Sequence, residues 1–136
     1  MTKDDLARAV VGLPGFAWVL GVSLDDGQRL VSQPPNGHWI WLSQDGETTE
    51  INTIHLSNLG VRRLDLDDAA TGGVLLAMVP PEHRHRVRWE PPSGSVPGYW
   101  AWACDVLAGQ VMWAMADSLG HAAALVLVDC GWCHGG

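Results

Sequence analysis

The stretch FAWVLGVSLDDGQRLVSQPPNGHWIWLSQDGETTEINTIHL, residues 16–56, decides the fold class of this chain of 136 residues. Asp25-Asp26-Gly27, residues 34–37 and Gln44-Asp45-Gly46 separate its apolar segments. Asp-Gly is a strong signal for a turn between antiparallel strands. The pattern therefore predicts an antiparallel meander with strands at residues 16–24, 28–32, 38–43 and 47–56.

Helical patterns lie on either side of this meander. Thr2 followed by Asp5 predicts an N-terminal cap for a helix that ends near residue 11. Residues 69–79 place their large apolar side chains at helical spacing, and Pro80-Pro81 ends that helix. Residues 118–129 predict a last helix, although residues 125–128 would also suit a strand.

The second half of the chain adds three predicted strands. They lie at residues 83–89, 99–106 and 111–116, with a loop rich in proline and glycine at residues 90–98. Together these elements predict one α+β domain, residues 1–136. We expect an antiparallel sheet of about five to seven strands with two or three helices.

Composition restricts the class of protein. Fifteen acidic and eight basic residues give a net charge of −7, which argues against direct binding to nucleic acid. The longest apolar run, residues 122–128, is shorter than the roughly 18 residues that a membrane helix needs. The acidic start, residues 1–5, does not match a signal peptide. We expect a cytoplasmic protein without a membrane partner.

Tryptophan is the unusual residue, with eight copies against one tyrosine and one phenylalanine. Trp39 and Trp41 alternate, as do Trp100 and Trp102, so each pair would share one face of a strand. Such a face fits the core of a sheet. It also fits an exposed contact for a protein partner, because tryptophan is enriched where binding energy concentrates.

The single basic cluster is HRHRVR, residues 83–88. On a strand, Arg84, Arg86 and Arg88 would share a face and could bind the carboxylates or phosphates of a partner. The alternative is a solvated edge strand whose charges prevent aggregation. The predicted partner-binding residues are thus Trp39, Trp41, Trp100, Trp102, Arg84, Arg86 and Arg88.

The C-terminal CGWCH motif is the strongest chemical pattern. Cys130, Cys133 and His134 suit zinc, and Cys104 or His85 would complete a tetrahedral set. Attachment of haem, thioredoxin-type redox chemistry and a disulfide between Cys130 and Cys133 are weaker matches to the same pattern. We expect no bound cofactor, with zinc as the alternative. The sequence contains no recognised catalytic motif, so it favours a binding protein over an enzyme.

Three stretches resemble a loose group of uncharacterised small proteins encoded in bacteriophage and prophage genomes. They are LPGFAW at residues 13–18, LDLDDAATGGVLLAMV at residues 64–79, and the C-terminal tryptophan-containing strand followed by a helix at residues 121–127. Ala69 and Gly73 stand where that group usually has proline and cysteine. The resemblance implies a phage accessory protein that works in the host cytoplasm.

These observations lead to one main hypothesis and two alternatives. The main hypothesis is a module that binds a host or phage protein, such as an inhibitor of a host defence system of the CRISPR type. The alternatives are a small zinc-binding protein and a homo-oligomeric structural component of a phage.

Overall fold

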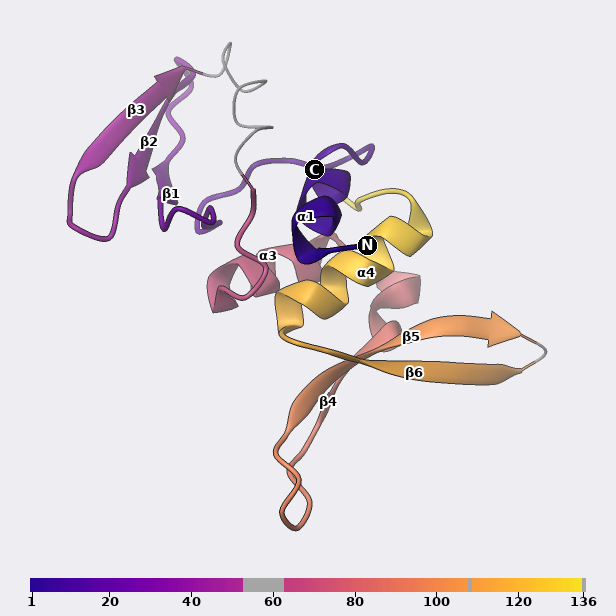
Figure 1. Ribbon diagram of the computed structural model, residues 1–136. Coiled ribbons are helices and arrows are strands. Elements are labelled where there is room, and N and C mark those ends of the chain that lie inside the picture. The colour runs from indigo at the N-terminus through magenta and orange to yellow at the C-terminus, as the bar shows by residue number, and fades with distance from the viewer. Residues whose placement is uncertain (53–62, 108, 136) are drawn as a thin grey trace.

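The computed structural model describes residues 1–52, 63–107 and 109–135. In these ranges the helices are α1 (Lys3–Val11), α3 (Ala69–Met78), α4 (Leu119–Cys130) and the 3₁₀ helix η2 (Pro81–Arg86). One antiparallel sheet contains β1 (Arg29–Ser32), β2 (His38–Leu42) and β3 (Thr48–Asn52), in that order. The other contains β4 (Val87–Glu90), β5 (Tyr99–Leu107) and β6 (Gln110–Ala116). Figure 1 shows the helices between the two sheets.

The α+β class is confirmed, but the single large sheet is wrong. The predicted strand at residues 16–24 forms only isolated bridges, from Ser23 to Arg29 and from Leu24 to Leu64. Residues 21–24 still form backbone hydrogen bonds with residues 28–30, and Leu24 also forms a bridge to Leu64 in the segment that leads into α3. These contacts do not make a regular strand, so the first sheet has three strands. The last part of the predicted strand 47–56 lies outside the described residues, and β3 covers Thr48–Asn52.

One hydrophobic core joins the first sheet to the helices. Its fully buried large side chains come from α1, α3, α4, the first sheet and the segment between α1 and β1: Leu6, Val10, Val22, Leu24, Leu30, Trp41, Leu75, Val79, Val126 and Leu127. Burying a side chain of this size stabilises a fold by about 1.5–3 kcal/mol. The second sheet joins this core through Val87 and Trp102, which pack against it.

The predicted helices are confirmed, and each begins at a side-chain cap. Thr2 and Asp5 form the expected capping box of α1. Asp68 caps α3 by accepting a hydrogen bond from the backbone N–H of Thr71, and Ser118 caps α4 in the same way through His121. Residues 125–128 belong to α4 rather than to a strand. Within the described part of the chain, no helix is long and apolar enough to cross a membrane.

The predicted strand at residues 83–89 is wrong in its first half. Pro81 begins η2, and the chain becomes extended only at Val87. Proline suits the first position of a helical turn because its φ angle is already fixed. The guanidinium of Arg84 also folds back onto the end of α3, where it donates to the carbonyl oxygens of Val79 (3.1 Å) and Ala77 (3.0 Å).

Two glycines bring the beginnings of α3 and α4 together. A Cβ atom on Gly120 would lie 2.1 Å from the carbonyl oxygen of Leu66. A Cβ atom on Gly72 would lie 3.0 Å from the backbone nitrogen of Gly120. Only residues without a side chain permit this approach, so the two helix starts and their caps lie close together.

Candidate functional site

The first tryptophan pair belongs to the core. Trp39 and Trp41 both pack there, and Trp41 is fully buried, with its ring centroid 5.9 Å from that of Trp18. The core interpretation is therefore confirmed for Trp41. This side chain is not available to a partner, so the exposed-contact interpretation does not fit it.

The second tryptophan pair is divided between two surroundings. Trp102 packs against the core, whereas Trp100 contacts Trp89 on the neighbouring strand. Trp89 and Trp100 lie opposite each other in the register of β4 and β5, and their ring centroids are 5.3 Å apart at an angle of 58°. Trp89 is 48% exposed, so this pair presents a wide apolar surface to solvent.

The position of the Trp89 ring is fixed by the hairpin that joins β4 to β5. A Cβ atom on Gly98 would lie 2.2 Å from Cζ2 of Trp89 and 3.1 Å from Cδ of Pro92. The indole therefore rests directly on the backbone of Gly98. Trp100 contacts the Trp89 indole from the neighbouring strand, and much of the remaining surface of Trp89 is open to solvent.

A pocket of about 300 Å³ lies next to this pair, with Trp100 as one wall. The beginnings of α3 and α4 supply the other walls, which is where the contact between Gly72 and Gly120 places them. The lining residues are Asp67, Asp68, Ala69, Trp100, Asp117, Ser118, Leu119 and Gly120. The pocket thus combines one large aromatic surface with three carboxylates.

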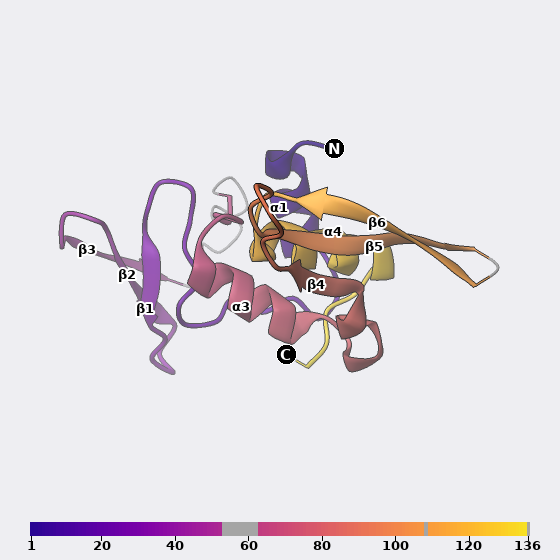
Figure 2. The same ribbon diagram turned by 90° about the horizontal axis from the view of Figure 1, so that it is seen from below.

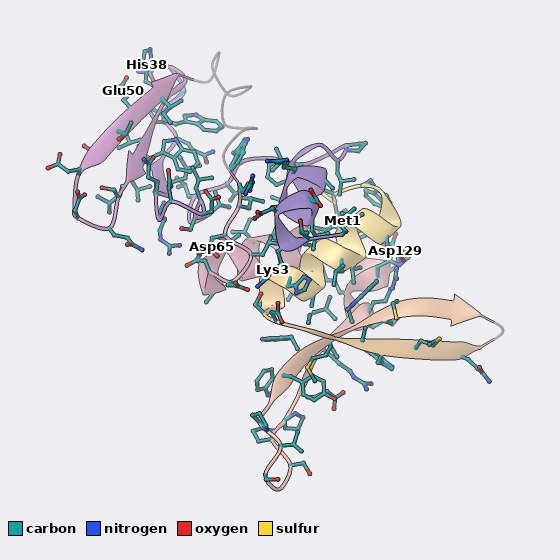
Figure 3. The ribbon with its side chains drawn as sticks, viewed as in Figure 1. Met1, Lys3, His38, Glu50, Asp65 and Asp129 are labelled. Atoms are coloured by element: carbon teal, nitrogen blue, oxygen red, sulfur yellow. The ribbon has the colours of Figure 1, made fainter. Side chains whose placement is uncertain are left out.

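Lys3 of α1 connects two of these carboxylates. Its Nζ lies 3.0 Å from Oδ2 of Asp67 and 3.0 Å from Oδ2 of Asp117. Hydrogen bonds to Asp67 and then to Asp117 raise the pKa of Lys3, and the bond from Lys3 lowers the pKa of Asp117. Figure 3 shows Lys3 near the beginning of α4. The three groups are exposed, so solvent screens these ion pairs and a competing cation can displace Lys3.

The third carboxylate is held more firmly. Asp68 accepts hydrogen bonds from both terminal nitrogens of Arg29, at 2.7 and 3.0 Å. This pairing is the main cause that lowers the pKa of Asp68 to about 2, and bonds from Thr71 act in the same direction. Asp68 is therefore ionised at neutral pH, and its charge connects the first sheet to α3.

His121 lies in the first turn of α4, beside the pocket, and is less readily protonated than a free imidazole. Its Nδ1 accepts a hydrogen bond from the backbone N–H of Asp117 at 3.2 Å, which places the proton of the neutral ring on Nε2. Burial lowers the pKa of His121, although Asp117 partly opposes the shift. Three carboxylates against the cations Lys3 and Arg29 leave one excess negative charge at the pocket, so it suits a further basic group.

The predicted arginine face does not form, because η2 replaces the first half of the expected strand. Arg84 bonds to the end of α3, as described above. Arg86 is buried, where it donates to the carbonyl oxygen of Ala103 (2.8 Å) and pairs with Asp129 near the end of α4 (Figure 3). Arg88 alone is exposed on the strand, and its guanidinium lies 3.7 Å from the ring centroid of Trp113.

The predicted zinc ligands are not gathered into a site. Cys133 is buried in the core, and burial raises its pKa to about 11. The thiol of Cys104 donates to the carbonyl oxygen of Met112 at 3.1 Å, and His134 contacts the ring of Trp132. Among the residues that the structure describes, no three His, Cys, Asp or Glu side chains are placed to hold a metal ion.

The cysteines are also placed differently from those of a redox site. Cys104, Cys130 and Cys133 are all free thiols. Burial raises the pKa of Cys130 as well as that of Cys133. A reactive thiolate needs a lowered pKa, so these surroundings do not favour it.

Sequence reasoning missed Trp89 and the acidic pocket. A signal for Trp89 was present, because in a hairpin centred on residues 94–95 it lies opposite Trp100. The pocket had no such signal, since it forms where two helices distant in the sequence meet.

No family model matches the chain, and searches of curated proteins and of solved structures find no match either.

Proposed function

We propose that this chain is a protein-binding module whose main contact is the Trp89–Trp100 pair. The observation that carries the proposal is an indole that is 48% exposed and yet held in place by Trp100 and Gly98. A rigid tryptophan offers a large contact area with little loss of conformational entropy on binding. Such residues often account for much of the binding energy of an interface.

The neighbouring pocket indicates the chemistry of the partner. Its wall of Trp100 and its carboxylates suit an arginine or lysine side chain, which can stack on an indole and pair with an aspartate. Such a side chain would replace Lys3 between Asp67 and Asp117. The net charge of −7 also attracts a basic partner over longer distances.

The resemblance to phage and prophage proteins extends the proposal to the identity of the partner. We propose that the partner is a host protein, and that binding blocks a host defence complex of the CRISPR type. This extension depends on the resemblance, whereas the contact surface depends on the geometry of Trp89 and its neighbours.

The experiment compares two exposed tryptophans. The wild-type chain, Trp89→Ala and Trp132→Ala are immobilised and exposed to extract of the host cell. Trp132 is 40% exposed and lies far along the sequence from the proposed contact, so it controls for the loss of any surface indole.

We expect wild type and Trp132→Ala to retain at least one protein from the extract. Trp89→Ala should retain that protein at least about tenfold more weakly. A tenfold loss corresponds to about 1.4 kcal/mol, which a central interface residue usually exceeds. Equal retention by all three folded proteins would contradict the proposed contact.

A further inference from the structure

Strand β6 is an edge of the second sheet, and its sequence QVMWAMA contains no charged residue. An edge strand exposes backbone N–H and C=O groups that can pair with another chain. Proteins usually prevent such pairing with charges, proline, bulges or covering segments. Strand β6 contains neither a charged residue nor a proline.

The other sheet edges are protected. Residues 21–22 cover β1. The N–H of Gly21 donates to the carbonyl oxygen of Leu30 (2.9 Å), and the N–H of Leu30 donates to the carbonyl oxygen of Val22 (3.0 Å). β3 carries Glu50, which forms an ion pair with His38. β4 has four residues and is followed by Pro91.

The side chains of β6 are exposed as well as its backbone edge. Val111, Met112 and Met115 are 46%, 61% and 70% exposed. In both Figure 1 and Figure 2 the hairpin of β5 and β6 extends past α4. From residue 91 to residue 116 the only charged residue is Asp105. The charges that keep copies of this acidic chain apart are therefore concentrated elsewhere.

The strand is also held in position by the neighbouring strands. Ala101 and Ala103 of β5 are small, so Arg88 of β4 reaches across them to the ring of Trp113 on β6. The guanidinium lies 3.7 Å from the ring centroid. This contact fixes Trp113 without covering the free edge.

We propose that two copies of the chain pair through β6, antiparallel and centred on Trp113. This register places Val111 opposite Met115 and Met112 opposite Ala114 of the second copy. Apolar pairs form at both positions, and the two Trp113 side chains lie opposite each other at the centre. No like charges face each other, so the strand complements itself. The second sheets of the two copies then form one continuous sheet of six strands.

The proposed dimer does not depend on the proposed function. Trp89 lies on β4, which is the opposite edge of the same sheet, so pairing through β6 leaves it free. A strand of this length forms a small interface, and we expect an association that depends on protein concentration.

The test measures mass by light scattering as the concentration of the purified chain is raised. Wild type should rise from 14.7 kDa toward twice that value. A variant with Val111→Lys and Met115→Lys should stay monomeric, because the register places these lysines opposite each other. A control with Leu20→Lys and Val96→Lys has the same change of charge at other exposed positions and should behave as wild type.

A third variant tests the register itself. Val111→Lys combined with Met115→Glu places opposite charges at the same cross-strand pair, so the rise in mass should return. A monomeric wild type would overturn the proposal, as would a double-lysine variant that still doubles in mass. Failure of the lysine–glutamate variant to associate would also overturn it. If the wild type stays monomeric but binds an unrelated extended peptide, the occupant of the β6 edge is another chain and the proposed dimer is wrong.

Discussion

Replacing Gly98 by alanine should displace the Trp89 ring without removing it. The added Cβ atom would lie 2.2 Å from Cζ2 and 2.7 Å from Cη2 of Trp89. Carbon atoms in contact prefer about 3.5–4.0 Å, so the ring has to move by more than about 1 Å. Gly98 does not have a positive φ angle, so alanine introduces no backbone strain of its own.

The expected cost follows from the contact that is lost. Contact between two aromatic rings contributes about 0.5–1.5 kcal/mol beyond the area that it buries, so unfolding in urea should show a loss of about 1 kcal/mol. Affinity for the captured partner should fall by at least about tenfold, because the displaced indole no longer matches its binding site. The binding defect should therefore exceed the folding defect.

The matched control is Gly73→Ala. Gly73 lies in α3 with nothing within 4 Å of its ideal Cβ position, so alanine should stabilise the helix by up to about 1 kcal/mol and leave binding unchanged. The reasoning is refuted if folded Gly98→Ala binds the partner as tightly as wild type does.

Two further predictions concern the framework of the pocket. Gly120→Ala should destabilise the protein by about 2–4 kcal/mol in urea unfolding, because the added Cβ atom would lie 2.1 Å from the carbonyl oxygen of Leu66. An unchanged unfolding midpoint would show that the close contact of α3 and α4 is not required. Hydrogen bonds from Arg29, and then from Thr71, lower the pKa of Asp68 from 3.8 to about 2. The folded-state pKa is the lower one, so these bonds together should contribute about 2 kcal/mol above pH 4 that is lost as the pH falls toward 2, and the largest part comes from Arg29. Arg29→Met should remove that part of the acid dependence, and an unaltered acid profile would contradict the assignment.

The helices were predictable because their signals are local. Thr2, Asp68 and Ser118 each cap the helix that follows, and Pro80-Pro81 ends α3 as expected. Such signals operate within a few residues. The α+β class follows from them and from the turns at Asp26-Gly27 and Asp45-Gly46.

The predicted surface was only partly right because burial depends on distant partners. The alternation of Trp39 and Trp41 resembles that of Trp100 and Trp102. The core covers Trp41, whereas Trp100 faces a pocket between two helices. No pattern within either strand distinguishes these outcomes, since the covering elements come from other parts of the chain.

The arginine cluster shows a second limit of sequence patterns. Alternation of charged residues at positions 83–88 matches a strand, but Arg84 is bound by the carbonyl oxygens at the end of α3 and Arg86 by Ala103 and Asp129. These bonds connect the cluster to three other elements. They favour a helical turn after Pro81 and leave only Arg88 exposed on the strand.

The most direct test of the central claim is site-specific crosslinking from the position of Trp89. A photoreactive aromatic residue is introduced in place of Trp89 in one protein and in place of Trp132 in another, and both are irradiated in extract of the host cell. We predict one major adduct from position 89 that position 132 does not form. Adducts of equal yield from both positions, or none from position 89, would contradict a binding surface centred on Trp89.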